Sequence, residues 1–512
     1  MTSPAEQDSV LLVGANLAGL MLAAELLRYA IQPVIIDHRR SRSTSGEQVT
    51  LNPESLEFFE QLGLLDGLVD KGLACGGMTV QMDGKVLAVS SFADAAAFYP
   101  FHLSIDRNVV EEQLIQFLAT RVCPVYWDTS ISSFQQNDQQ VRVELKGGRL
   151  SGSHRFAWLL LADGEQFNVA ANLQLPYSLA VKDLPFFRMA VQTDELHNRN
   201  QHVSLNRKGI LFSTPVDSTG NYRFLCSQGA AGNGHPGFDE LKSRLDEVLG
   251  FSLPVRMPGL VQLGSLGVSL ASSFRQQRCI LLGNAAYPSE LLDNLLSNQG
   301  IADARAIAWR LAYVLKGLQD ASVMDSIDRE RRKAASDLLR KLDRGLQLAV
   351  LGRKLPSAAA AALLKPYLAA LPRRRPHLRD SPLSLHHARG KGLRAGDRLP
   401  FLPLYDEKRK EMTDLHQCCT KMGFVLLMLG TLNKNSLFII RQWAQQKYMQ
   451  QMSLFYLPYS DRNQAVFDAF EVGAEAVKMV LVRPDRYIAY MHDTVSANLV
   501  DAYMTSVMKW RF

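Results

Sequence analysis

The residues best placed to do chemistry lie near the N-terminus, in the segment Gly14-Ala-Asn-Leu-Ala-Gly19. A β-prone apolar run, 9–13, precedes this segment, and a helical pattern of apolar residues follows it. A second apolar run, 33–36, ends at Asp37, which lies 18 residues beyond Gly19. In a βαβ unit of this kind the glycines permit a tight turn and close helix packing, the helix N-terminus attracts a pyrophosphate, and the acidic residue accepts hydrogen bonds from ribose hydroxyls. The spacing predicts a dinucleotide site, although Asn16 replaces the middle glycine, so a βαβ unit without a bound nucleotide stays open as the alternative.

The elements that must position this site form a parallel sheet covered by helices. Strand-like pieces alternate with turn residues over 172–270, which predicts an inserted antiparallel sheet. An apolar strand returns at 279–282, and a glycine and a long helix from about Gly300 to Leu318 follow it. The parallel sheet is therefore expected to resume there.

We predict an α/β protein with four parts. A Rossmann-type domain comprises residues 1–171 and 271–330, and the inserted sheet comprises 172–270. A basic helical connection covers 331–385, and a second α/β domain covers 386–512.

Composition and charge exclude several classes of protein. The 512 residues are 47% hydrophobic and 21% charged, which is typical of a globular protein and not of a disordered chain or a membrane bundle. The net charge of +7 arises in residues 331–379, which contain 13 Lys and Arg against 2 Asp and Glu. The rest of the chain is slightly acidic, and no nucleic-acid module accompanies the basic band. We therefore expect no nucleic-acid partner.

The six cysteines include no Cys-x-x-Cys pair and no metal-ligand spacing. A reducing, cytoplasmic location and no metal site are the simplest interpretation, and His386-His387 lacks partners at ligand spacing. The apolar stretch 10–27 follows Glu6 and Asp8 instead of positive charge and contains two glycines, so we expect neither a signal sequence nor a membrane anchor.

Eight motifs, in order, give the chain a resemblance to a known family. They are Val13-Gly-Ala-Asn-Leu-Ala-Gly-Leu-Met-Leu-Ala-Ala-Glu25, Ser55-Leu-Glu-Phe-Phe-Glu-Gln-Leu-Gly-Leu64, Ala162-Asp-Gly164, Ile280-Leu-Leu-Gly-Asn-Ala-Ala286, Gly300-Ile-Ala-Asp-Ala304, Ala308-Trp-Arg-Leu311, Leu393-Arg-Ala-Gly-Asp-Arg-Leu-Pro400 and Leu481-Val-Arg-Pro-Asp-Arg-Tyr-Ile-Ala489. Over nearly its whole length the chain resembles the class A flavoprotein monooxygenases, in particular the phenol hydroxylase and aromatic polyketide hydroxylase branch. The resemblance implies that 172–270 binds the substrate and that 386–512 is thioredoxin-like.

The resemblance also implies a function. It implies an FAD-dependent monooxygenase that takes hydride from NAD(P)H and hydroxylates a small phenolic or polyketide-type aromatic substrate, in secondary metabolism. The protein's part in such chemistry is to place the cofactor and exclude water. The cofactor-binding residues that the resemblance implies are Gly14, Asn16, Ala18, Gly19, Asp37, Arg107, Asp163, Gly164, Gly283, Asn284 and Asn298.

The sequence departs from the family pattern around the cofactor. Gln166, Phe167 and Ala170 stand where the family continues with Ser and Arg residues, and Asn284 replaces an aspartate. The loop 287–299 contains no glycine, although the family has a Gly-rich loop facing the flavin there. These departures predict flavin binding that is altered, weakened or lost.

Two other functions therefore stay open: a flavin-independent, non-redox catalyst such as a cyclase or dehydratase, and a non-catalytic partner of a related flavoenzyme. The sequence assigns no catalytic residue, and Tyr287, Glu290 and Asp293 are either acid–base groups or packing residues. The C-terminal domain lacks Cys-x-x-Cys, so we expect it to pack against its neighbour or to form an oligomer contact, as in a homodimer.

Overall fold

The computed structural model describes residues 10–42, 47–92, 98–163, 172–196, 200–229, 236–370, 377–407, 409–419, 421–449 and 451–512. The chain divides into two units. The first contains Met1–Ala24, Gln32–Ala304 and Ala335–Arg374, and the second contains Glu25–Ile31, Arg305–Ala334 and Arg375–Phe512. The boundaries of the four predicted parts stay predictions.

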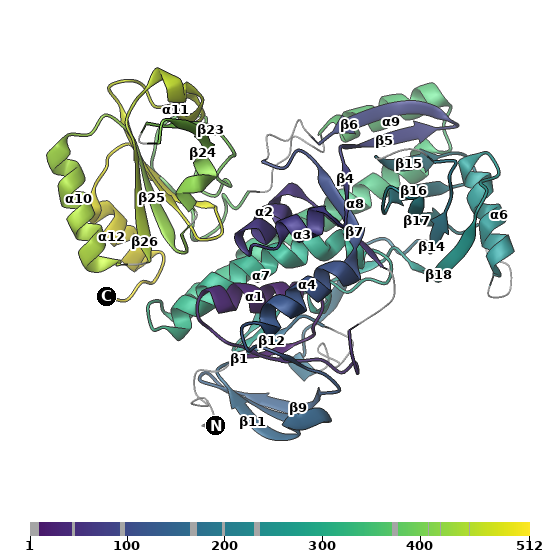
Figure 1. Cartoon of the computed structure of the whole chain (residues 1–512), viewed down its shortest axis with the longest axis horizontal. Helices are drawn as coiled ribbons and strands as arrows, with labels where there is room; N and C mark the ends of the chain where they lie inside the picture. The colour runs from purple at the N-terminus through teal and green to yellow at the C-terminus, as the bar shows by residue number, and fades with distance from the viewer. Residues whose placement is uncertain are drawn as a thin grey trace. The chain divides into compact units, whose positions relative to one another are not determined.

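The first unit contains a six-stranded sheet, whose strands β1 and β12 are labelled beside α1 and α4 in Figure 1. Its order is β20 (Arg275–Gln276), β21 (Cys279–Leu281), β12 (Trp158–Leu161), β1 (Val10–Val13), β2 (Val34–Ile36) and β8 (Val125–Tyr126). All neighbouring pairs except β20–β21 are parallel. Every residue of β1, β12 and β21 is buried, as expected for strands covered on both faces. Helix α1 (Leu17–Arg28) connects β1 to β2, so the predicted βαβ unit is confirmed.

A seven-stranded sheet is the other large sheet of this unit. Its order is β18 (Met257–Ser265), β14 (Pro185–Gln192), β17 (Asn221–Ser227), β16 (Ile210–Pro215), β15 (Gln201–Leu205), β5 (Gly77–Met82) and β6 (Lys85–Ser91). Helix α6 (Phe238–Leu249) packs on it through Leu241, Leu245 and Val248. The predicted inserted sheet is confirmed, but two strands from residues 77–91 complete it. The alternating pattern of these residues indicates strands without revealing their partner, because pairing with β15 is non-local.

Smaller elements surround the two sheets. They are β3 (Gln48–Leu51), β4 (Leu73–Cys75), β7 (His102–Asp106), β9 (Ser130–Gln136), β10 (Val141–Lys146), β11 (Gly152–Phe156), β13 (Tyr177–Val181), β19 (Val268–Ala271), α2 (Pro53–Gln61), α3 (Leu65–Val69), α4 (Arg107–Ala119), α8 (Lys333–Gly352) and α9 (Ser357–Ala370). Figure 1 shows α9 beside β5 and β6, and α9 contacts β6. Strand β3 ends at Leu51, and the next residue is Asn52, whose Oδ1 accepts the Ser55 N–H and caps α2.

Helix α7 (Asp293–Leu315) begins earlier than the sequence predicts. The expected start near Gly300 is wrong by about two turns. The physical reason is that residues 293–299 contain neither glycine nor proline and so continue the helix toward its N-terminus. In this chain a helical turn therefore occupies the place where the resemblance implies a glycine-rich loop.

The C-terminal part of the second unit is a mixed α/β layer. Its five-stranded sheet has the order β22 (Leu385–His386), β28 (Ile488–His492), β27 (Val477–Val482), β25 (Phe424–Gly430) and β26 (Met452–Leu457), and a hairpin of β23 (Pro403–Asp406) and β24 (Glu411–Asp414) accompanies it. Its helices are α10 (Lys434–Lys447), α11 (Gln464–Phe470) and α12 (Ala497–Ser506). Every residue of β25 is buried. The α/β class of this part is confirmed, while its likeness to thioredoxin stays a prediction.

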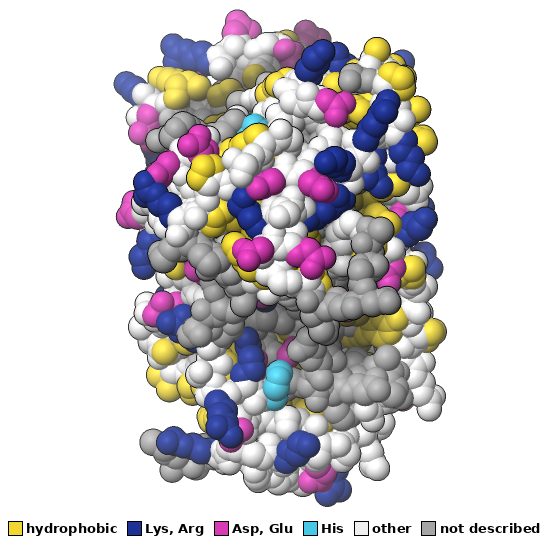
Figure 2. Space-filling model, turned by 90° about the vertical axis from the view of Figure 1, so that its right-hand side faces the viewer, with side chains coloured by type: hydrophobic (Ala, Val, Ile, Leu, Met, Phe, Trp, Pro, Cys, Tyr) yellow, Lys and Arg dark blue, Asp and Glu magenta, His cyan; other side chains and the backbone are white. Residues whose placement is uncertain are grey.

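Among the described helices, none is long and apolar enough to cross a membrane. Within the described residues there is also no group of three His, Cys, Asp or Glu side chains that could hold a metal ion. On the face drawn in Figure 2, Lys and Arg side chains are interspersed with Asp and Glu side chains.

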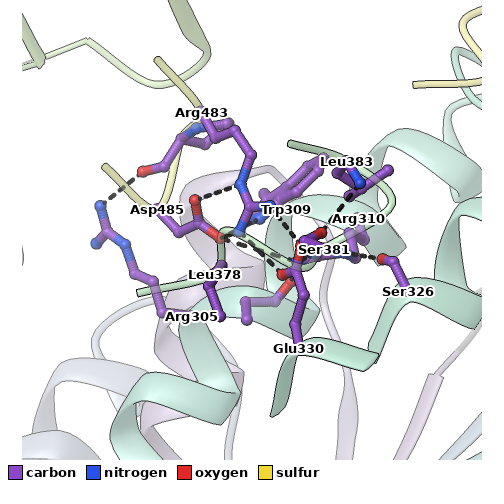
Figure 3. Close-up of polar contacts among 12 residues, drawn as sticks. Arg305, Trp309, Arg310, Ser326, Glu330, Leu378, Ser381, Leu383, Arg483 and Asp485 are labelled. Atoms are coloured by element: carbon purple, nitrogen blue, oxygen red, sulfur yellow. Dashed lines mark hydrogen bonds and ion pairs between the residues drawn. The ribbon is translucent and has the colours of Figure 1, made fainter. Parts of the chain in front are cut away.

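A buried acid–base cluster lies inside the second unit (Figure 3). The Glu330 carboxylate accepts hydrogen bonds from Arg310 and from Arg483, whose two terminal nitrogens are 2.6 and 3.0 Å from its oxygens. Asp485 accepts from Arg483 at 2.7 and 2.9 Å and from the Trp309 indole at 3.0 Å. Two guanidinium groups thus balance two carboxylates where water has no access.

The charges of this cluster control its ionisation. Burial alone would raise the pKa of Glu330, but Arg310 and Arg483 outweigh burial and hold that pKa below its ordinary value. The same balance lowers the pKa of Asp485 to about 2. Both carboxylates are therefore charged at neutral pH and depend on their arginine partners.

We predict that Glu330→Gln lowers the free energy of unfolding by about 3 to 5 kcal/mol, because a neutral amide leaves two buried guanidinium groups undercompensated. Urea denaturation followed by circular dichroism measures the change. Arg340→Gln is the matched control, since it removes an exposed ion pair with Asp337. If the denaturation midpoint of Glu330→Gln falls no further than that of the control, Glu330 does not stabilise the fold by balancing the two buried guanidinium groups.

Candidate dinucleotide site

Two glycines shape the turn between β1 and α1. Gly14 has a φ of +103°, and a Cβ there would lie 2.6 Å from the Asp163 Cβ. A Cβ at Gly19 would lie 2.1 Å from the Gly14 carbonyl oxygen. Both positions therefore require glycine, the first for its backbone angle and the second for the approach of helix to strand. The geometry is that of the dinucleotide turn predicted from the sequence.

Asn16 occupies the N-cap position directly before α1. Its Oδ1 accepts the Gly19 N–H at 3.1 Å, and its Nδ2 donates to the Ala162 carbonyl oxygen at 2.9 Å. The residue is 8% exposed. The side chain is thus held across the turn, between the start of α1 and the end of β12.

Asp37 lies at the end of β2 and is fully buried. One carboxylate oxygen accepts the Ala15 N–H at 2.8 Å, and the Arg39 guanidinium donates to both oxygens at 2.8 and 2.9 Å. Burial alone would raise the pKa of Asp37, but the hydrogen bonds from Arg39 and Ala15 outweigh it and leave the pKa below its ordinary value. The structure places this charged carboxylate beside the turn, as predicted, and adds Arg39, which the sequence analysis missed.

Asp163 faces the same turn from the end of β12. Its carboxylate lies 3.7 Å from the His38 Nδ1, which is equally far from Asp37. The neighbouring Gly164 lies outside the described residues, as do Gln166, Phe167 and Ala170. Their roles stay predictions.

The second glycine contact joins α7 to α1. Gly283 has a φ of +54°, and a Cβ at Gly283 or at Gly300 would lie 2.9 Å from the Ala18 Cβ. Ala18 therefore packs against the backbone at Gly283 and Gly300. Its contact with a cofactor stays a prediction. Asn284 is half-buried in the short turn Gly283–Ala285.

Residues 287–299, where the resemblance implies a glycine-rich loop, make side-chain hydrogen bonds within the protein. The buried Tyr287 hydroxyl donates to the Asp303 carboxylate at 2.7 Å, and Gln299 donates to its other oxygen at 3.2 Å. The exposed Glu290 accepts the Ser265 N–H at 2.9 Å. These contacts favour packing over acid–base roles for Tyr287 and Glu290, whereas the Asp293 side chain lies outside the description.

Asn298 connects α7 to the start of α2. Its Nδ2 donates to the Thr50 carbonyl oxygen at 2.7 Å, and its Oδ1 accepts from the Asn52 N–H at 2.9 Å and the Ser55 hydroxyl at 2.8 Å. The structure thus gives this predicted cofactor residue three partners inside the protein. Its contact with a cofactor stays a prediction.

Arg107 begins α4 and is surrounded by acidic groups. It donates to Glu111 at 2.9 Å and to Glu47 at 3.1 Å. Glu47 also lies 3.8 Å from Arg188, whose guanidinium donates to the Leu291 carbonyl oxygen at 2.6 Å. The sequence analysis missed Glu47 and Arg188, which belong to no motif and meet Arg107 only through the fold.

The fold and the turn define a dinucleotide-binding α/β protein. A family model described as "FAD binding domain" matches residues 7–341. The chain belongs to this family, whose description names FAD as the cofactor.

Three curated relatives are similar to this chain. A 6-methylpretetramide 4-monooxygenase of Streptomyces rimosus is 27% identical over 66% of this chain and 62% of the relative, and a pentachlorophenol 4-monooxygenase of Sphingobium chlorophenolicum is 24% identical over 65% and 63%. The matches thus span less than two thirds of these relatives. A 3-(3-hydroxy-phenyl)propionate/3-hydroxycinnamic acid hydroxylase of Mycolicibacterium gilvum is 25% identical over 96% of this chain and 90% of the relative.

Solved structures share the fold over almost the full length. The flavin-dependent monooxygenase PieE, solved with FAD and substrate, has a TM-score of 0.82 at 16% identity and covers 98% of both chains. Aklavinone-11 hydroxylase, solved with FAD and aklavinone, has a TM-score of 0.77 at 19% identity over 99% of both chains. The Diels-Alderase PyrE3 has a TM-score of 0.69 at 19% identity, over 98% of this chain and 100% of that chain.

The residues present fit the adenosine diphosphate half of FAD. Gly14 forms a cradle that a Cβ would fill, α1 begins directly after the turn, and the Asp37 carboxylate is charged at the end of β2. These are the groups that would hold a pyrophosphate and a ribose. Where the resemblance implies a glycine-rich loop facing the flavin, this chain instead begins α7 at Asp293.

We predict that Gly14→Ala destabilises the protein more than Gly250→Ala. Both glycines have positive φ, +103° and +85°, but a Cβ at Gly250 meets nothing within 4 Å. Gly250→Ala should therefore cost about 1 to 2 kcal/mol from backbone strain, and Gly14→Ala about 1 to 3 kcal/mol more from the clash with Asp163. Thermal unfolding measures both, and equal losses in the two variants would show that the turn is not crowded.

Proposed function

We propose that this chain is an FAD- and NAD(P)H-dependent monooxygenase that hydroxylates a small phenolic or polyketide-type aromatic substrate, in secondary metabolism. The observation that carries the proposal is the β1–α1 turn with Asp37, set in a chain that belongs to the FAD-binding family over 7–341. The relatives named as monooxygenases of phenols and of a pretetramide support the substrate class.

Each part of the described site has a task in this proposal. The turn at Gly14 brings the α1 N-terminus to the pyrophosphate, where backbone N–H groups favour negative charge. The Asp37 carboxylate accepts hydrogen bonds from the adenosine ribose, and Arg39 holds it in place and charged. FAD, when bound, supplies the redox chemistry: it accepts hydride from NAD(P)H and activates dioxygen.

The apolar segment before and within α7 suits the exclusion of water. Leu291, Leu292 and Leu296 are buried, and the Tyr287 hydroxyl is already paired with Asp303. A dry surrounding strengthens electrostatic interactions and suppresses side reactions of a reactive cofactor. In the proposal, these buried leucines help to keep water away from the reacting part of the cofactor.

The six cysteines are free and buried, which agrees with a reducing compartment. We therefore assign the protein to the cytoplasm. A homodimer stays a prediction that the oligomeric state in solution will decide.

A non-redox reaction on a related substrate is the second candidate. The observation that favours it is the replacement of the glycine-rich loop by the first turns of α7, which puts side chains where a flavin ring would meet backbone. The structural neighbour PyrE3, named as a Diels-Alderase, shows that this fold also occurs in a protein named for a non-redox reaction. A repurposed scaffold would keep the turn and lose the need for dioxygen.

The proposed function predicts visible flavin bands from the purified protein after FAD is added and free FAD is removed, together with NAD(P)H oxidation and oxygen uptake that increase when a phenol is present. Absorbance spectra and an oxygen electrode measure these changes. A protein that shows no flavin bands after incubation with excess FAD contradicts the proposal. Substrate turnover without flavin, nicotinamide and dioxygen would establish the non-redox candidate instead.

A further inference from the structure

The carboxamide of Asn16 is hydrogen-bonded to one of the N–H groups at the start of α1. Its Oδ1 accepts the N–H of Gly19, the third residue of the helix, at 3.1 Å. Its Nδ2 is anchored on the Ala162 carbonyl oxygen at 2.9 Å. The Asn16 side chain therefore bridges the turn through two hydrogen bonds and does not extend into solvent. We call this pair of hydrogen bonds the clasp.

Other amides of the turn also have acceptors inside the chain. The Gly14 N–H donates to the Ile36 carbonyl oxygen at 2.9 Å, and the Ala15 N–H donates to Asp37 at 2.8 Å. A helix N-terminus attracts an anion through N–H groups that the helix itself leaves unsatisfied. An N-cap side chain satisfies one of them, and so it occupies part of what a pyrophosphate would use.

We infer that Asn16 is a built-in competitor of the FAD pyrophosphate, which lowers the affinity for every diphosphate-containing ligand of this site. A bound pyrophosphate approaches the turn where a second glycine would leave the backbone bare, so the carboxamide must release Gly19 and Ala162 before the phosphates can reach the helix. The inference rests on the proposed function, because it takes FAD as the ligand. It assigns Asn16 the role of setting affinity, with no part in the chemistry.

Asn16→Gly tests the inference directly. Glycine is nearly as good an N-cap as asparagine, so the fold is kept while the clasp is removed. We expect FAD to bind about tenfold more tightly to this variant, which corresponds to the recovery of about one hydrogen bond. Asn16→Asp keeps the cap and adds a negative charge, so it should bind FAD more weakly than the unchanged chain.

The matched control is Asn433→Gly in α10. Asn433 is also an N-cap, and its Oδ1 accepts the Ser436 N–H at 2.7 Å. Its substitution removes the same kind of hydrogen bond from a helix outside the turn. The control should leave the FAD affinity unchanged.

Quenching of flavin fluorescence measures the dissociation constant of FAD. Calorimetry with ADP and with adenosine shows whether the change in affinity depends on the phosphates of the ligand. The gain in Asn16→Gly should appear with FAD and ADP and be absent with adenosine, which has no phosphate. Equal FAD affinity in Asn16→Gly and the unchanged chain, or an equal gain with adenosine, overturns the inference and leaves the proposed function standing. FAD binding by neither protein overturns both, whereas FAD binding by the Asn16→Gly variant alone supports the inference and contradicts FAD use by the natural chain.

Discussion

Close packing at the glycines around the β1–α1 turn is the constraint on which the first unit depends. Gly14 and Gly19 permit the tight turn between β1 and α1, and Gly283 and Gly300 leave room for Ala18. A Cβ at any of these four glycines would lie within 3 Å of another atom. Since atoms cannot approach so closely, the packing of α1 and α7 around this turn requires glycine at these four positions.

Polar groups around the β1–α1 turn are hydrogen-bonded to partners within the protein. Asp37 is satisfied by Arg39 and Ala15, and Asn16 is satisfied by Gly19 and Ala162. A buried polar group without a partner is costly, so these internal bonds stabilise the turn before any ligand arrives. A ligand must therefore exchange existing hydrogen bonds for new ones, and its net gain is smaller than its number of contacts suggests. Asn16, one departure from the family pattern, takes part in this exchange through its hydrogen bonds to Gly19 and Ala162.

Local patterns in the sequence predicted the βαβ unit, the position of Asp37 and the inserted sheet, because each depends on neighbours within a few tens of residues. The strands of 77–91 in the second sheet and the contacts of Asn298 could not be predicted, since their partners are distant in sequence. The Trp-Arg motif of α7 and the Arg-Pro-Asp motif near residue 485 lie far apart in the sequence. Only the structure shows that both meet at Glu330 in one buried cluster.

A crystal structure of the protein grown with FAD tests the central claim most directly. The account predicts a pyrophosphate at the start of α1, with the Asn16 carboxamide turned away from the Gly19 amide and the Asp37 carboxylate within hydrogen-bonding distance of the adenosine ribose. The account is contradicted if FAD binds elsewhere on the chain, or if it occupies the turn while the Asn16 side chain keeps its hydrogen bonds to Gly19 and Ala162.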